Sequence, residues 1–194
     1  MVTLEKVKKL RNATSISIMQ CKKALDEARG DFEKAKIILQ KKGSAVVEKK
    51  AGRTLGSGTV GAYIHNTKHV DAMVILACET DFVAKNEEFI ALTHDIAMHI
   101  AATNPLYISE KDIKAEDKKR AKEVFMEEAA GKPDTLKDKI VQGKLDAYFK
   151  EKILLTQAFI KDPNSTIQNL IESATQKFGE KIELTNFIRF STRD

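Results

Sequence analysis

The sequence predicts an α+β fold, in which a small antiparallel sheet carries packed helices and a helical hairpin projects from the core. The first observation is a helical spacing of apolar residues over 3–43. The second is a pair of strand-like segments, 59–65 and 70–78, separated by a polar turn. The third is the charge-dense segment 109–152, where apolar residues are sparse. A chain of 194 residues is long enough for one sizeable core and a small second domain.

The first domain is predicted at 1–43 and contains three short helices. The second helix spans about 17–29, and Gly30 stands where a helix commonly ends. Asp31 can cap the N-terminus of the third helix, which is predicted to end at Gly43 after two lysines. A segment of about 40 residues buries too little apolar surface for a catalytic domain, so we interpret it as a docking module.

The following segment, 44–56, loses its periodicity and gathers glycine and lysine, which predicts a linker. The core domain then covers 57–194. It begins with two strands, 59–65 and 70–78, which flank a turn and form the start of an antiparallel sheet.

A helix is expected next, with its N-terminal cap near Asn86 and its end before Pro105. The segment at about 110–152 predicts two antiparallel helices, because a turn-forming stretch at 131–134 divides it into halves. The remaining expected elements are a helix at 166–178, followed by Gly179, and a closing strand at 183–190.

The glycine-rich stretch at 56–61 has the formal spacing of a dinucleotide-binding loop. Such a loop follows a strand and opens a helix, whereas this one follows a basic linker and enters a strand. These glycines are therefore expected to serve chain flexibility and strand entry.

His94 and His99 lie five residues apart on one predicted helix, which is the wrong spacing for a metal pair. We expect no catalytic residue, no cofactor and no metal.

The charge pattern favours a protein partner over nucleic acid or a membrane. The formal net charge is +5, but 33 Lys and Arg are interleaved with 28 Asp and Glu, which is typical of solvated helix faces. No apolar run reaches the roughly 18 residues of a membrane span. The N-terminus enters an amphipathic helix without a signal-peptide pattern, so a cytoplasmic location with reduced Cys21 and Cys78 is expected.

The most informative segment is 80–86 (TDFVAKN), which lies between the strand ending at Cys78 and the helix starting near Glu87. An acid and an aromatic ring stand side by side at this corner. One interpretation is an exposed binding wedge on a rigid turn. The other is that Phe82 packs in the core and Asp81 caps the helix, which composition alone favours because most phenylalanines are core residues.

A resemblance to a known family favours the first interpretation, in which Phe82 is an exposed binding wedge. The stretch CETDFVAKNEEF at 78–89 resembles the signature of elongation factor Ts, and LRNATSISIMQCKKALDEARGD at 10–31 resembles the opening motif of that family. The likeness extends over nearly the whole chain and includes FIRF at 187–190. It implies that the first domain is a ubiquitin-associated-type (UBA-like) module and that the core is a single condensed form of the two repeats in longer members.

The resemblance also implies a function and a set of contact residues. Members of this family are guanine-nucleotide exchange factors without covalent chemistry, in which the Asp-Phe pair docks beside the nucleotide and Mg²⁺ site of elongation factor Tu. Short members are similar to forms that dimerise, so a homodimer is expected here. The partner-binding residues implied by motif matching are Thr80, Asp81, Phe82, Val83, Arg11, Ile18, Met19, Lys22, Lys50, His65 and Ile160.

A second function class remains open at this stage. The chain could instead be a basic adaptor or an RNA-associated protein that uses the three-helix module and the hairpin without exchange activity. GDP release from elongation factor Tu separates the two hypotheses, and RNA binding with a steep salt dependence would favour the second.

Overall fold

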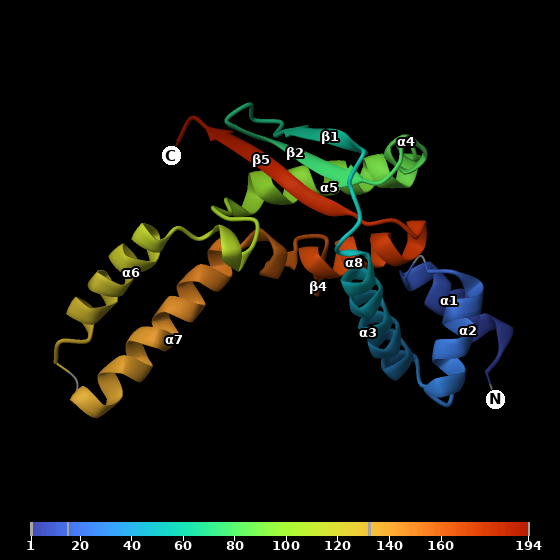
Figure 1. Ribbon diagram of the computed structural model, residues 1–194, viewed down its shortest axis with the longest axis horizontal. Helices are drawn as coiled ribbons and strands as arrows, with labels where there is room; N and C mark the ends of the chain where they lie inside the picture. The colour runs from blue at the N-terminus through green and yellow to red at the C-terminus, as the bar shows by residue number, and fades with distance from the viewer. Residues whose placement is uncertain (1, 15, 132, 194) are drawn as a thin grey trace.

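The computed structural model describes residues 2–14, 16–131 and 133–193. Figure 1 shows a three-stranded sheet at the top of the molecule, a layer of helices beneath it, and two helical arms that project downward. This is the predicted α+β class with helices on one side of a small antiparallel sheet.

The arm on the right of Figure 1 is the N-terminal three-helix segment. The helices are α1 (Leu4–Thr14), α2 (Ile18–Glu27) and α3 (Phe32–Lys50). Their apolar faces form a separate cluster around the fully buried Leu10, Leu25 and Leu39. The Asp31 side chain accepts a 3.0 Å hydrogen bond from the Lys34 N–H, which confirms the predicted cap of the third helix. Gly30 adopts φ +81°, a conformation that suits glycine.

The predicted end of the third helix at Gly43 is wrong, because α3 continues to Lys50 and includes part of the expected linker. The reason is tertiary packing against α8 (Ile167–Phe178). A Cβ atom at Gly43 would lie at ordinary contact distance, 3.4 Å from the Gln176 side chain and 3.8 Å from Glu172, so α3 and α8 pack directly against each other here. One residue later, the Ser44 hydroxyl donates a 2.7 Å hydrogen bond to Glu172. The division into a docking module and a core domain stays a prediction.

The sheet has the order β1-β2-β5, and all its neighbours are antiparallel. The strands are β1 (Ser57–Ile64), β2 (Val70–Cys78) and β5 (Glu183–Ser191), as the alternating patterns predicted. Gly61 serves close packing and not chain flexibility, because a Cβ there would lie 2.8 Å from the Thr93 backbone of the helix beneath. Only glycine fits that contact without a shift of the backbone.

Two helices cover the inner face of the sheet. The first is α5 (Glu87–Thr103), whose N-terminal cap is Asn86 as predicted and whose C-terminal cap is Asn104 at φ +49°, directly before Pro105. The second is α8, which Thr166 caps and Gly179 ends at φ +70°. The sheet and both helices share one apolar cluster, which includes Val74, Leu76, Phe89, Ile96, Ile171 and Leu184.

The arm on the left of Figure 1 is the predicted hairpin of α6 (Ala115–Glu128) and α7 (Asp134–Lys152). The predicted turn at 131–134 includes Lys132, which lies outside the described residues. Short elements that the sequence did not predict connect the hairpin to the core. They are the 3₁₀ turns η1 (Glu110–Asp112) and η2 (Leu154–Thr156) and the strands β3 (Ala158–Phe159) and β4 (Asp162–Thr166).

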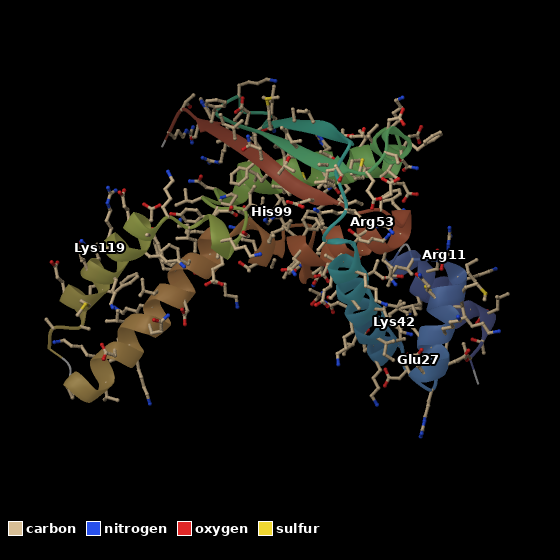
Figure 2. All side chains as sticks on the ribbon, in the orientation of Figure 1. Arg11, Glu27, Lys42, Arg53, His99 and Lys119 are labelled. Atoms are coloured by element: carbon tan, nitrogen blue, oxygen red, sulfur yellow. The ribbon has the colours of Figure 1, made fainter. Side chains whose placement is uncertain are left out.

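His99 lies fully buried on α5 near the base of the hairpin (Figure 2). Its Nε2 donates to the Gln157 side-chain oxygen at 2.9 Å, and Thr103 donates to the same oxygen. Its Nδ1 is buried and has no hydrogen-bond partner among the described residues. Burial lowers the pKa of His99, and the Gln157 hydrogen bond opposes that shift only in part. The neutral imidazole is therefore the form that the folded state accommodates.

This burial predicts a pH dependence of stability. The folded-state pKa lies below the unfolded value of about 6.5, so the unfolded chain binds more protons as the pH falls through that value. The free energy of unfolding should be constant above about pH 7 and fall below it by up to about 1.4 kcal/mol per pH unit. Urea unfolding between pH 8 and pH 5.5 measures this slope. His99→Gln should flatten it, whereas His94→Gln, an exposed position on the same helix, should not. Equal slopes for both variants would contradict the prediction.

Candidate functional site

The predicted corner lies where β2 ends and a single helical turn, α4 (Asp81–Ala84), begins (Figure 1). The Phe82 side chain is 87% exposed, the largest exposed fraction among the exposed large apolar residues. Val83 and Ala84 face the opposite way and are buried against the sheet. The alternative that Phe82 packs in the core is therefore wrong. The corner presents an aromatic ring to solvent.

Two hydrogen bonds anchor the buried side of α4. The Thr59 hydroxyl on β1 donates to the Ala84 carbonyl at 2.7 Å, and the Cys78 thiol donates to the Thr80 carbonyl at 3.1 Å. Burial raises the pKa of the Cys78 thiol, so it remains a protonated donor at neutral pH. These contacts hold the backbone at both ends of the turn, so the position from which the Phe82 side chain projects is fixed on the solvent side.

Asp81 stands beside the ring and remains charged. Its carboxylate accepts a 2.7 Å hydrogen bond from Lys85, and this contact lowers the pKa of Asp81. It caps neither helix, because Thr80 is the cap residue of α4 and Asn86 is that of α5. The corner thus exposes a negative charge next to an apolar ring.

A second set of contacts fixes the corner from the other end of the chain. The Glu180 carboxylate, directly after α8, accepts hydrogen bonds from the N–H of Glu79 at 3.1 Å and the N–H of Thr80 at 3.0 Å. It also accepts from the Thr80 hydroxyl at 2.6 Å. In the opposite direction, the Glu79 carboxylate accepts from the N–H of Lys181 at 2.5 Å. This bond is the main cause of the lowered pKa of Glu79.

Arg53 adds an ion pair to this contact set. Figure 2 places Arg53 on the segment between α3 and β1, and its guanidinium contacts the Glu79 carboxylate at 3.1 and 3.2 Å. Sequence reasoning missed the whole set, because Glu79 and Glu180 are 101 residues apart and belong to no shared motif. The signals that were present are a charged pair after Gly179 and an acid directly before the TDFV motif.

The predicted residues of the N-terminal module lie on its solvent side. Ile18 and Met19 open α2 and are 53% and 66% exposed, and Lys22 follows one turn later. Arg11 is exposed on α1 and is labelled in Figure 2; its charge contributes, after burial, to the lowered pKa of Lys177 on α8. All four residues are exposed, and Ile18, Met19 and Lys22 combine apolar and basic groups at the start of α2.

The remaining predicted residues do not share one place. Lys50, at the end of α3, donates a 2.6 Å hydrogen bond to the carbonyl of Gly179, next to the corner. His65 follows β1 at the end of the strand away from the corner, where its ring contacts the Thr67 hydroxyl at 2.8 Å. Ile160 is 42% exposed in the turn between β3 and β4. The structure brings Lys50 to the corner and separates His65 and Ile160 from it.

Over residues 2–14, 16–131 and 133–193, His, Cys, Asp and Glu form no group of three that could hold a metal ion. None of the helices in those ranges is long and apolar enough to cross a membrane. The glycine stretch at 56–61 enters β1, so it does not stand at a helix N-terminus as a dinucleotide loop would.

Comparison with known proteins gives consistent matches. The family model described as "Elongation factor TS" matches residues 7–194. The elongation factor Ts of Acetivibrio thermocellus is 47% identical over 192 residues, which cover 98% of this chain and 89% of the relative. That of Thermodesulfovibrio yellowstonii is 47% identical over 97% of this chain and 95% of the relative. That of Desulfotalea psychrophila is 44% identical over 97% of each chain.

An α+β core with an N-terminal three-helix arm and an exposed, structurally fixed corner, together with these matches, defines a translation elongation factor of protein biosynthesis. The chain belongs to the elongation factor Ts family, because the family model and the relatives cover nearly its whole length.

The exposure of Phe82 predicts that its removal does not affect stability. Phe82→Ala should change the free energy of unfolding by less than about 0.5 kcal/mol, since the ring buries little surface. The matched control is Phe89→Ala, seven residues later on α5, where the ring is fully buried and its loss should cost about 3–5 kcal/mol. Urea unfolding monitored by circular dichroism measures both. A large loss for Phe82→Ala would mean that the ring packs inward in solution.

Proposed function

We propose that this protein is a guanine-nucleotide exchange factor that binds elongation factor Tu with GDP and promotes GDP release during translation in the cytoplasm. The main support is the 87% exposed Phe82 on a corner fixed from both sides. An exposed ring that contributes nothing to its own core, at the position matching the family motif, is suited to contact a partner. Membership of the elongation factor Ts family supports elongation factor Tu as that partner.

The proposed mechanism is displacement and involves no covalent step by this chain. Phe82 inserts between side chains of the partner beside its nucleotide site, and the charged Asp81 accompanies it. Mg²⁺ requires near-ideal octahedral geometry, so a small shift of the groups around it weakens the hold on GDP. Binding of the exchange factor and binding of GDP then oppose each other by the same coupling free energy.

Phe82 alone supplies too little energy for this task. Burial of one phenylalanine side chain contributes about 2–3 kcal/mol, which corresponds to one to two decades of affinity at about 1.4 kcal/mol per decade. We therefore propose that the module shares the binding. Ile18 and Met19 expose apolar surface at the start of α2, beside the basic Lys22. The other proposed contacts are Arg11, Lys50, His65, Thr80 and Ile160, whereas Val83 is buried and is proposed to support Phe82 from the inner side of α4.

The test is release of fluorescent GDP from purified elongation factor Tu. The wild-type chain should accelerate release, and Phe82→Ala should lower the maximal rate by about 10- to 100-fold, as expected for the loss of one buried ring. Tyr148→Ala is the control, because Tyr148 is also an exposed aromatic residue but lies on the hairpin helix α7. It should leave the rate unchanged.

Failure of the wild-type chain to accelerate release would refute the exchange function. An equal loss in both variants would refute the role of Phe82 as a specific wedge. Tight RNA binding that weakens steeply with salt would instead favour the RNA-associated adaptor.

We also propose that the chain forms a homodimer through the outer face of the sheet. No helix of the described residues covers that face (Figure 1). Cross-strand register places Val60 beside Ile75 and Met73 beside Ile188, and all four side chains are exposed. Adjacent exposed apolar residues of this kind are typical of an interaction surface.

Sedimentation velocity tests the dimer. The wild-type chain should sediment as a dimer at micromolar concentration, and Met73→Glu should convert it to a monomer because a charge would be buried at the centre of the interface. Ile37→Glu is the control, since Ile37 is exposed on α3, away from the sheet. A monomeric wild-type chain, or dissociation by the control alone, would contradict the proposal.

A further inference from the structure

The Glu180 carboxylate lies at the junction between α8 and β5 and accepts three hydrogen bonds from the corner. The donors are the N–H of Glu79, the N–H of Thr80 and the hydroxyl of Thr80, at 3.1, 3.0 and 2.6 Å. Hydrogen bonds to an ionised acceptor are roughly twice as strong as neutral ones. A single side chain therefore holds Glu79 and Thr80, the two residues directly before α4.

The contact is reciprocal. While Glu180 accepts from the corner, the Glu79 carboxylate accepts from the N–H of Lys181 on the junction. The regular ladder between β2 and β5 ends at the pair Ala77 and Glu183, so these side chains continue the connection where strand pairing stops. We name the three residues Glu79, Thr80 and Glu180 the clasp. It holds Thr80 in an extended conformation, at φ −128° and ψ 157°, and this sets the direction in which α4 leaves the sheet.

The clasp also lies next to the end of α3. Lys50 donates to the carbonyl of Gly179, one residue before Glu180, and Arg53 contacts the Glu79 carboxylate. Both cations are at or just after the C-terminal end of the helix that connects the N-terminal module to the sheet. The junction at 179–181 thus links the module to the corner.

We propose that Glu180 is a positioning residue for exchange, which orients Phe82 without touching the partner's nucleotide. This inference rests on the proposed exchange function. Phe82 itself has no core contact that would fix its direction, so the orientation of the ring depends on the backbone of α4. Loss of Glu180 leaves the ring present and exposed but releases the start of that turn.

The experiment separates positioning from binding. In the GDP-release assay with elongation factor Tu, Glu180→Ala should lower the maximal rate by roughly 10-fold, since misplacement by about 1 Å is enough for a loss of that order. The half-saturating concentration should change less than about 2-fold, because the exposed surface on α2 is intact. Glu180→Gln keeps one oxygen acceptor and should lie between wild type and Glu180→Ala.

Two controls make the result specific. Glu183→Ala removes an exposed acid three residues later, whose partner Lys181 is at 3.0 Å and which makes no side-chain contact with the corner; it should match wild type. In the Phe82→Ala background, Glu180→Ala should have no further effect, because both substitutions act through one ring. Hydrogen exchange of the Glu79 and Thr80 amides should accelerate in Glu180→Ala and stay slow in Glu183→Ala.

The possible outcomes test the exchange function and the positioning role of Glu180 separately. If the wild-type chain does not stimulate release, the exchange function and this inference both fail. If it does, and Glu180→Ala retains the wild-type maximal rate or adds its full effect to that of Phe82→Ala, only the positioning role of Glu180 is overturned. A change confined to the half-saturating concentration would make Glu180 a binding residue instead.

Discussion

The pairing of β2 with β5 is the interaction on which the rest of the structure depends. It joins segments that lie more than 100 residues apart and closes the sheet on which α5 and α8 pack. Because α8 leads directly into β5, the same pairing carries Gly179 and Glu180 to the end of β2. The corner, the end of α3 and the sheet therefore meet at one place, although they belong to three segments that are distant in the sequence.

Exposure of Phe82 is a consequence of how α4 is built. A helical turn of only four residues has one inward side, and Val83 and Ala84 occupy it. The ring has no space on that side and therefore faces solvent. The folded state forgoes the stabilisation of about 2–3 kcal/mol that burial of a phenylalanine side chain contributes. Hydrogen bonds from Thr59 and to Glu180 hold this arrangement. The corner thus exposes an apolar ring that contributes little to its own stability.

Sequence reasoning predicted those parts of the fold that local patterns encode. Alternation identified β1, β2 and β5, and the caps Asp31 and Asn86 marked the starts of α3 and α5. It failed where a distant contact decides the local structure: α3 passes Gly43 because α8 packs against it. For the site, the resemblance identified the corner, but periodicity cannot assign the direction of Phe82 in a turn of four residues. Glu180 was missed because only the folded sheet brings it to Thr80.

The spread of the candidate residues constrains any partner. β1 has eight residues, so His65 lies roughly 25 Å along the sheet from the corner at about 3.3 Å per residue. Ile18 and Met19 lie on the projecting arm, and Ile160 lies in the turn below the sheet (Figure 1). A partner that contacts all of them must follow the chain around its module and its core. In the proposed mechanism, Phe82 contributes only part of the binding energy, and its distinct role is to act beside the nucleotide of the partner. Such a mechanism would require a fixed backbone at the corner, whereas the surface on α2 would require only exposed apolar and basic side chains.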